Sequence, residues 1–306
     1  MNDSPFFIVL VAIVGGALRV STPFMFVALG ECLTEKSGRV NLGLEGTLVL
    51  GAMTAYATSY HTGSPWLGVL AAGGAGVFLG SIHGYVCKLP MVNDIAIGIS
   101  MMLFGTGLAF FLGKPFIQPH APGLPAFDLG WWSAIPQLRE ALKVNALFLA
   151  GVVLAPALRW GLDHTRWGMI VRIVGDSADA ALALGYSPNR VRLAATAFGG
   201  FMAGVGGSFL SLYYPGSWNE GLSSGQGITA VALVIFARWN PIACFGASLL
   251  FGGAGALGPA LQAVGVTSGT YLLNAAPYIL TLVILVLSSS SRRRIAGAPG
   301  ELSVTK

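Results

Sequence analysis

The sequence predicts an all-α, polytopic helical membrane protein with about eight to ten transmembrane helices and one short helix in a cytoplasmic loop. Of its 306 residues, 54% are hydrophobic and only 9% are charged, whereas charged residues make up about 25% of a typical soluble domain. The mean hydropathy is +0.72. So few charges and so much apolar surface exclude a water-soluble globule, a disordered chain and a nucleic-acid-binding domain.

Apolar stretches that are separated by charges, prolines or polar clusters give the candidate spans. A helix needs about 20 mostly apolar residues to cross the bilayer core. The candidates are 5–29, 40–59, 65–87, 92–112, 145–163, 191–213, 225–238, 241–260 and 270–290. Arg19 and the Ser-Thr-Pro run that ends at Pro23 interrupt the first stretch, which is therefore one helix or two. The stretch 225–238 is short for a full span, so we expect it to be tilted or broken.

The basic residues collect on one side of these spans. If the spans alternate in direction, 13 of the 17 Lys and Arg residues lie on the side of the C-terminus, three lie on the other side, and Arg19 lies within a span. Basic loops stay in the cytoplasm, so we expect a cytoplasmic C-terminus and an N-terminus outside. The pI of 9.3 then follows from topology and does not indicate nucleic acid as a partner.

Two long connections stand out. Residues 113–144 form an external loop with five prolines and the adjacent Trp131 and Trp132. We expect this loop to pack over the outer mouth, with its tryptophans at the membrane interface, and we expect Trp218 to be a further interface anchor. Residues 164–190 form a long cytoplasmic loop.

The loop 164–190 has the signals of a short helix. Asp176 and Ser177 can cap its start, residues 178–184 are strong helix formers, and Gly185 stands where a helix ends, before a Ser-Pro turn. One interpretation is a surface helix that only shortens a long connection. The other is a docking helix for a cytoplasmic partner.

Polar residues within spans are costly and tend to mark transport pathways. The candidates are Asn41, Glu45, Asn93, Asp94, Gln226, Thr229 and Asn274. Asn93 and Asp94 can equally cap a helix. Glu45 can pair with Arg39 or Arg19 to hold the fold, or it can contact a solute hydroxyl.

Aromatic residues are a second kind of candidate, because their rings can stack on the flat face of a base or sugar. Phe104, Phe110 and Phe111 fall in the span 92–112 or at its end. The plainer interpretation is that they pack in the core or face lipid.

Glycines at four-residue spacing let helix backbones approach closely in lipid. Gly76, Gly80 and Gly84 form one such set, and Gly200 and Gly204 form another. The sequence has no GxxxxGK[ST], HExxH or GxSxG motif, and its three cysteines are scattered. We therefore expect no catalytic residues, no metal site and no cofactor bound by this chain.

Several blocks resemble a known family in the same order. They are ALGECLTEKSGRVNLGLEGTLVLGA (28–52), SSGQGITAVALVIFARWNPIACFGASLLFGG (223–253), PYILTLVILVL (277–287) and the APGEL ending. They resemble the permease subunits of ABC importers of the branched-chain amino acid, ribose and nucleoside type, above all the nucleoside (basic membrane lipoprotein-associated) subfamily. The resemblance implies a single transmembrane permease domain over 1–306 in the bacterial inner membrane, and nucleosides or related small polar solutes as cargo.

The resemblance also implies partners. They are cytoplasmic ATPase subunits that use ATP and Mg, a second permease subunit of different sequence, and an extracytoplasmic solute-binding lipoprotein. In that family the loop that corresponds to 168–185 touches the ATPase. We therefore expect Gly168, Arg172, Gly175, Asp176, Ala180 and Gly185 to serve in coupling.

The competing hypothesis is a self-sufficient secondary transporter or channel driven by an ion gradient. Glu45 would then be the coupling acid, and inverted repeats would be expected. No such repeat is clear in the sequence. With a permease, the expected solute pathway includes Asn41, Glu45, Asn93, Asp94, Phe104, Gln226 and Thr229.

Overall fold

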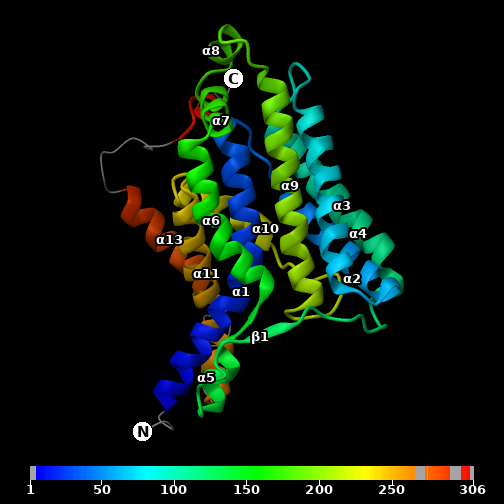
Figure 1. The fold of residues 1–306 in the computed structure, drawn as a ribbon, viewed down its shortest axis with the longest axis vertical. Coiled ribbons are helices and arrows are strands. Elements are labelled where there is room, and N and C mark those ends of the chain that lie inside the picture. The colour runs from blue at the N-terminus through cyan, green and yellow to red at the C-terminus, as the bar shows by residue number, and fades with distance from the viewer. Residues whose placement is uncertain (1–4, 266–272, 274, 290–297, 304–306) are drawn as a thin grey trace.

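A computed structural model of the chain describes residues 5–265, 273, 275–289 and 298–303, and it confirms an all-α, polytopic protein (Figure 1). The helices and strands are α1 (Pro5–Lys36), α2 (Leu44–Thr62), α3 (Pro65–Val86), α4 (Asp94–Gly113), η1 (Lys114–Phe116), β1 (Ala126–Asp128), α5 (Pro136–Ala141), β2 (Lys143–Asn145), α6 (Ala146–His164), α7 (Arg166–Asp176), α8 (Ala178–Ala183), α9 (Pro188–Leu212), α10 (Gln226–Phe236), α11 (Pro241–Ala263), α13 (Ala276–Ser289) and α14 (Gly300–Ser303).

Each predicted apolar stretch overlaps a helix of the described residues. Among the described residues, α1, α3, α4, α6, α9 and α11 are long and apolar enough to cross a membrane. Helix α2 is 19 residues long and mostly buried among its neighbours. The stretch 225–238, expected to be too short for a full span, holds only the 11-residue helix α10. Asn274 lies outside the described residues.

The first stretch is one helix and not two. Helix α1 runs without interruption through Pro23 and continues to Lys36, for 32 residues. At 1.5 Å per residue it is about 48 Å long, which exceeds the hydrocarbon thickness of about 30 Å. The hydroxyl groups of Ser21 and Thr22 donate to the carbonyl oxygen of Leu18 just before the proline.

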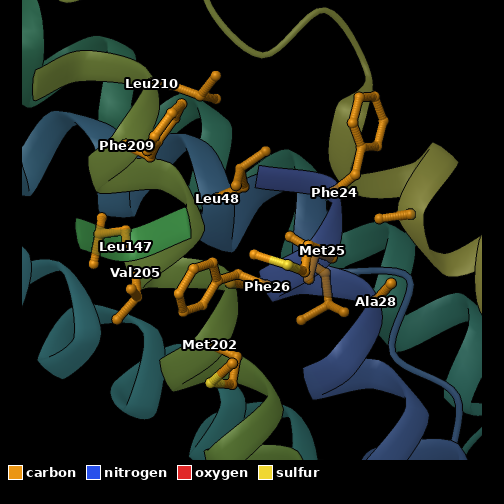
Figure 2. Packing of buried hydrophobic residues seen from close by; sticks show 14 of the residues in the cluster. Phe24, Met25, Phe26, Ala28, Leu48, Leu147, Met202, Val205, Phe209 and Leu210 are labelled. Carbon is orange, nitrogen blue, oxygen red and sulfur yellow. The ribbon is translucent and has the colours of Figure 1, made fainter. Parts of the chain in front are cut away.

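Helix α9 lies at the centre of the bundle, packed on α1, α2 and α3. The predicted glycine contacts are confirmed here, because a Cβ atom at Gly200 would lie 2.2 Å from the carbonyl oxygen of Gly76, and one at Gly204 would lie 2.1 Å from that of Ala72. Figure 2 shows the apolar core beside this contact, where Phe26 of α1, Leu48 of α2 and side chains of α9 meet.

The bundle has two distinct ends (Figure 1). Helices α7 and α8 and the C-terminal segment lie at one end, here called the α8 end. The N-terminus, α5 and β1 lie at the opposite end, here called the β1 end. Strand β1 pairs antiparallel with β2, so residues 113–144 contain a small structured unit and not only an irregular loop.

That unit is attached to α2. The hydroxyl of Tyr56 donates to the carbonyl of Pro119 at 2.9 Å, and that of Ser59 donates to Pro122 at 2.7 Å. Trp131 and Trp132 are exposed, as an interfacial position requires. The prediction for Trp218 was wrong. Its side chain is 1% exposed, and its Nε1 donates to the carbonyl of Gly113, because the segment after α9 folds inward.

Candidate functional site

The chain folds back into the bundle between α9 and α11. Residues 213–225, here called the re-entrant segment, lead to α10, which packs against α1 and α2. Helix α10 is about 16 Å long, roughly half of the hydrocarbon thickness, and Figure 1 shows it among the longer helices. Its N-terminus therefore lies inside the protein, where its free N–H groups need acceptors.

Glu45, at the start of α2, supplies those acceptors. Its Oε1 accepts from the Ser223 hydroxyl at 2.5 Å and from the Gly225 amide at 3.1 Å. Its Oε2 accepts from the amides of Gly227 at 2.6 Å and Ile228 at 3.4 Å. A carboxylate also complements the partial positive charge at a helix N-terminus. Glu45 thus fastens α10 to α2.

Two glycines allow this approach. Gly225 precedes α10 with a φ of +82°, a left-handed conformation that favours glycine. A Cβ atom at Gly227 would lie 2.6 Å from the Cα of Glu45. The Gly-rich entrance SSGQG is therefore required for the backbone contact with the carboxylate.

The ion pairs predicted for Glu45 were wrong. Arg39 pairs with Asp94 at the start of α4, and Arg19 pairs with Glu140 of α5 at 3.4 Å. Each arginine therefore pairs with another carboxylate, and Glu45 binds the amides at the start of α10.

Two cavities lie on either side of Ser224 in the re-entrant segment. The larger one, here called the Glu45 cavity, measures about 360 Å³ and lies between α2, α4 and the segment. The smaller one, here called the Gln226 cavity, measures about 160 Å³ and lies between α1, α10, α11 and α13. Ser224 lines both cavities. The larger volume falls within the range of about 300–1,000 Å³ that is typical of small-molecule sites.

The two cavities differ in their linings. The Glu45 cavity has Glu45, Thr106, Phe110, Glu220 and Ser223 among its walls. The Gln226 cavity has polar groups and aromatic rings, namely Gln226, Thr229, Phe24, Phe251 and Tyr278. The Oε1 atom of Gln226 is buried and has no hydrogen-bond partner among the described residues.

The structure gathers only some of the predicted pathway residues. Glu45, Gln226 and Thr229 meet around the re-entrant segment. Asn41 forms a turn before α2, where its Oδ1 accepts from the Gly43 amide at 2.9 Å. The other three lie at the start of α4 or within it, outside both cavity linings: Asn93 caps the helix, Asp94 pairs with Arg39, and Phe104 is exposed.

The predicted helix in the loop 164–190 is present as α8. Ser177 caps it by accepting from the Ala180 amide at 3.2 Å, and Gly185 adopts a φ of +82° after its end. Asp176 does not cap α8, because it is the last residue of α7. The sequence reasoning missed α7, an amphipathic helix capped by Thr165.

The remaining predicted coupling residues are positioned by packing. A Cβ atom at Gly168 would lie 2.3 Å from the carbonyl of Gly161 on α6, and one at Gly175 would lie 2.1 Å from that of Lys36 on α1. Arg172 lies 4.0 Å from Asp163. Ala180 is exposed on α8.

Two buried carboxylates were also missed. Glu31 and Glu35, one turn apart on α1, are 0% and 1% exposed. Oε1 of Glu31 accepts from the Asn41 amide at 2.7 Å, and Glu35 accepts from Nε1 of Trp239 after α10. The signal was present, because two acidic residues four apart continue an apolar helix. They join α1 to the connection before α2 and to the end of α10.

Comparisons with known proteins find relatives among ABC transporter permeases. The nucleoside ABC transporter permease protein NupC of Lactococcus lactis is 28% identical over an alignment of 292 residues that covers 90% of this chain and 91% of NupC. The guanosine ABC transporter permease protein NupQ of Bacillus subtilis is 29% identical over an alignment of 301 residues that covers 90% of this chain and 92% of NupQ. The putative glucose ABC transporter permease protein TsgC13 of Haloferax volcanii is 29% identical over 245 residues, 78% and 74% of the two chains.

The family model named branched-chain amino acid transport system / permease component matches residues 13–289. That range extends from α1 to the last residue of α13 and includes the re-entrant segment, both cavities and α7–α8. This multi-pass membrane protein therefore belongs to the family of permease components of branched-chain amino acid transport systems.

Proposed function

We propose that the chain is the permease subunit of an ATP-driven importer and carries nucleosides. The observation that carries the proposal is the half-helix α10, held inside the bundle by Glu45 with a cavity on each side. Broken helices of this kind present free backbone and side-chain groups to a solute in transporters. Two relatives that align with 90% of the chain are named as nucleoside and guanosine permeases.

The two linings suit the two parts of a nucleoside. A base has flat apolar faces and hydrogen-bonding edges, and the Gln226 cavity offers aromatic rings together with the unpartnered amide oxygen of Gln226. A ribose has hydroxyl donors, and the Glu45 cavity offers Glu220 and Thr106. Both oxygens of Glu45 are already engaged by the segment, so its role is to hold the pathway and not to bind solute.

Helices α7 and α8 would dock on the partner ATPases, which bind ATP and Mg, while this chain holds no cofactor and performs no catalysis. The α8 end then faces the cytoplasm together with the C-terminus. The β1 end receives solute from an extracytoplasmic binding lipoprotein. A second permease subunit of different sequence completes the pore in the inner membrane.

Transport follows from two packings of similar free energy. Solute enters an outward cavity between the two permeases, closure of the ATPases pulls on α8, and the cavity opens inward. Glycine contacts such as that of α3 with α9, where backbones touch directly, allow small sliding movements of packed helices.

Uptake measurements with the complete transporter test this function. We expect labelled nucleoside to accumulate, and we expect Gln226→Leu to raise the KM for uptake about tenfold, because a buried hydrogen bond to solute is lost. The matched control is Gln262→Leu, an exposed glutamine near the end of α11, which should leave KM unchanged.

A sugar is the second candidate cargo, because TsgC13 is named as a putative glucose permease. Competition separates the two. Uptake of labelled glucose that excess nucleoside does not reduce, with no accumulation of labelled nucleoside, would overturn the nucleoside proposal. An unchanged KM in Gln226→Leu would remove the Gln226 cavity from the pathway.

A further inference from the structure

The described end of the chain is seated against the coupling region. Residues 298–303, here called the C-terminal clasp, include α14 and lie against α7, next to α8 (Figure 1). Ala298 and Leu302 pack against the apolar core. The clasp thus lies where α1 and α7 end and α9 begins.

Glu301 connects the clasp to two separate helices. Its Oε1 accepts from the Ala178 amide at 2.8 Å, at the first residue of α8. Its Oε2 lies 3.1 Å from a guanidinium nitrogen of Arg192 on α9. The Arg192 side chain is 12% exposed, and its Nε donates to the carbonyl of Ser37 at 3.1 Å. One carboxylate therefore links α8 to the ends of α1 and α9.

Glycines make the fit close. A Cβ atom at Gly300 would lie 2.4 Å from the carbonyl of Asp176, at the end of α7. Gly38 has a φ of +84°, and a Cβ there would lie 3.0 Å from the Cβ of Glu301 and 3.2 Å from Arg192. The backbone around the clasp leaves no space for larger side chains at these two positions.

We propose that the C-terminal clasp fixes the position of α8, with Glu301 as the positioning residue. This inference rests on the proposed function of α8 as the docking helix. A helix of six residues is too short to be stable alone, so its caps decide whether it forms and where it points. Ser177 is the local cap and Glu301 is the distant one. Through Arg192, the distant cap makes the placement of α8 depend on the packing of α1 and α9.

Amide hydrogen exchange of the purified permease–ATPase complex tests the contact directly. Glu301→Ala should speed exchange over residues 178–184 about fivefold, the effect of losing one cap. Glu301→Gln keeps an acceptor for the Ala178 amide but loses the charge toward Arg192, and it should fall between Glu301→Ala and the wild type. Asp179→Asn is the matched control for exchange, since it removes a carboxylate from the first turn of α8 without touching the clasp.

Coupling is the readout that a merely structural contact would not move. In the reconstituted transporter, Glu301→Ala should lower the ratio of solute transported to ATP hydrolysed severalfold while the thermal midpoint of the bundle stays unchanged, and Glu301→Gln should restore part of that ratio. The proposal would be overturned if Glu301→Ala keeps the wild-type ratio of solute transported to ATP hydrolysed, or if its amide exchange over residues 178–184 equals that of the wild type. If the wild-type complex itself transports no solute, the proposed function fails, and the exchange result still decides whether the clasp holds α8.

Discussion

Two carboxylates of this chain act on short helices to which they do not belong. Glu45 accepts three amides and one hydroxyl at the start of α10 and is 8% exposed. Glu301 accepts one amide at the start of α8, and its side chain is 31% exposed. Water can replace Glu301, but it cannot readily replace Glu45 inside the bundle. The contact of Glu45 with α10 is therefore required for the structure of the pathway. The contact of Glu301 with α8 can break and re-form without unfolding the bundle.

Removing the inner carboxylate should have the largest effect. Glu45→Ala leaves several buried donors without acceptors, at about 1–3 kcal/mol for each unsatisfied group, so we expect a loss of about 3 kcal/mol or more in stability. Thermal unfolding in detergent measures it. Glu220→Ala, which changes the same cavity from an exposed position, should unfold like the wild type. Equal stability of Glu45→Ala and Glu220→Ala would contradict the structural role of Glu45.

The second test concerns the close contact between the backbones of α10 and α2. Gly227→Ala would place a Cβ 2.6 Å from the Cα of Glu45, and overpacking of this kind costs about 1–3 kcal/mol. Gly246→Ala on α11 is the matched control, because nothing lies within 4 Å of a Cβ there. The control should unfold at the wild-type temperature or slightly above it. If Gly227→Ala behaves like its control, α10 has room to move and Glu45 does not fix it.

At the α8 end, Gly185→Val should act on coupling more than on stability. The φ of +82° at Gly185 is unfavourable for a β-branched residue by about 1–2 kcal/mol, but no neighbouring atom would clash with its Cβ. We expect uptake per ATP to fall while the thermal midpoint changes little. Gly161→Ala, a helical position that also faces open space, should change neither. Normal solute-stimulated hydrolysis and uptake in Gly185→Val would contradict a coupling role for α8.

The smallest effect should come from the local cap of α8. Ser177→Ala alone should weaken α8 by about 1 kcal/mol, because Glu301 still holds the first amide. Combined with Glu301→Ala, it should cost more than the sum of the single changes, which is the signature of two groups that support one element. A double-mutant cycle of amide exchange over 178–184 measures the interaction. Strict additivity would show that the two caps act independently.

Local signals predicted most of the helices. The lengths of the apolar stretches located the long helices. The cap at Ser177 and the stop at Gly185 predicted α8 to within one residue of its observed end. The Glu45 contacts could not be predicted in the same way, because the carboxylate and Ser223 are 178 positions apart. The sequence shows that a buried acid needs a partner, but Arg39, Arg19 and a solute hydroxyl were all possible partners of Glu45. Only the fold shows that Arg39 and Arg19 are already paired.

The missed features share a second cause. Trp218 and the clasp make long-range contacts that no helical period indicates. An aromatic residue in a loop typically marks an interface, and a polar C-terminal segment resembles a solvated tail. In both cases the contacts include a long-range hydrogen bond to a backbone group.

Amide exchange over residues 223–230 in Glu45→Gln tests the central claim most directly. The claim is that Glu45 holds the start of α10 and does not serve as a solute ligand. Glutamine keeps one acceptor oxygen, so one of the Gly225 and Gly227 amides loses its acceptor, and its exchange should speed about tenfold or more. Glu220→Gln, in the same cavity, should leave these rates unchanged. Wild-type exchange in Glu45→Gln together with a raised KM for solute would contradict the claim and make Glu45 a binding residue.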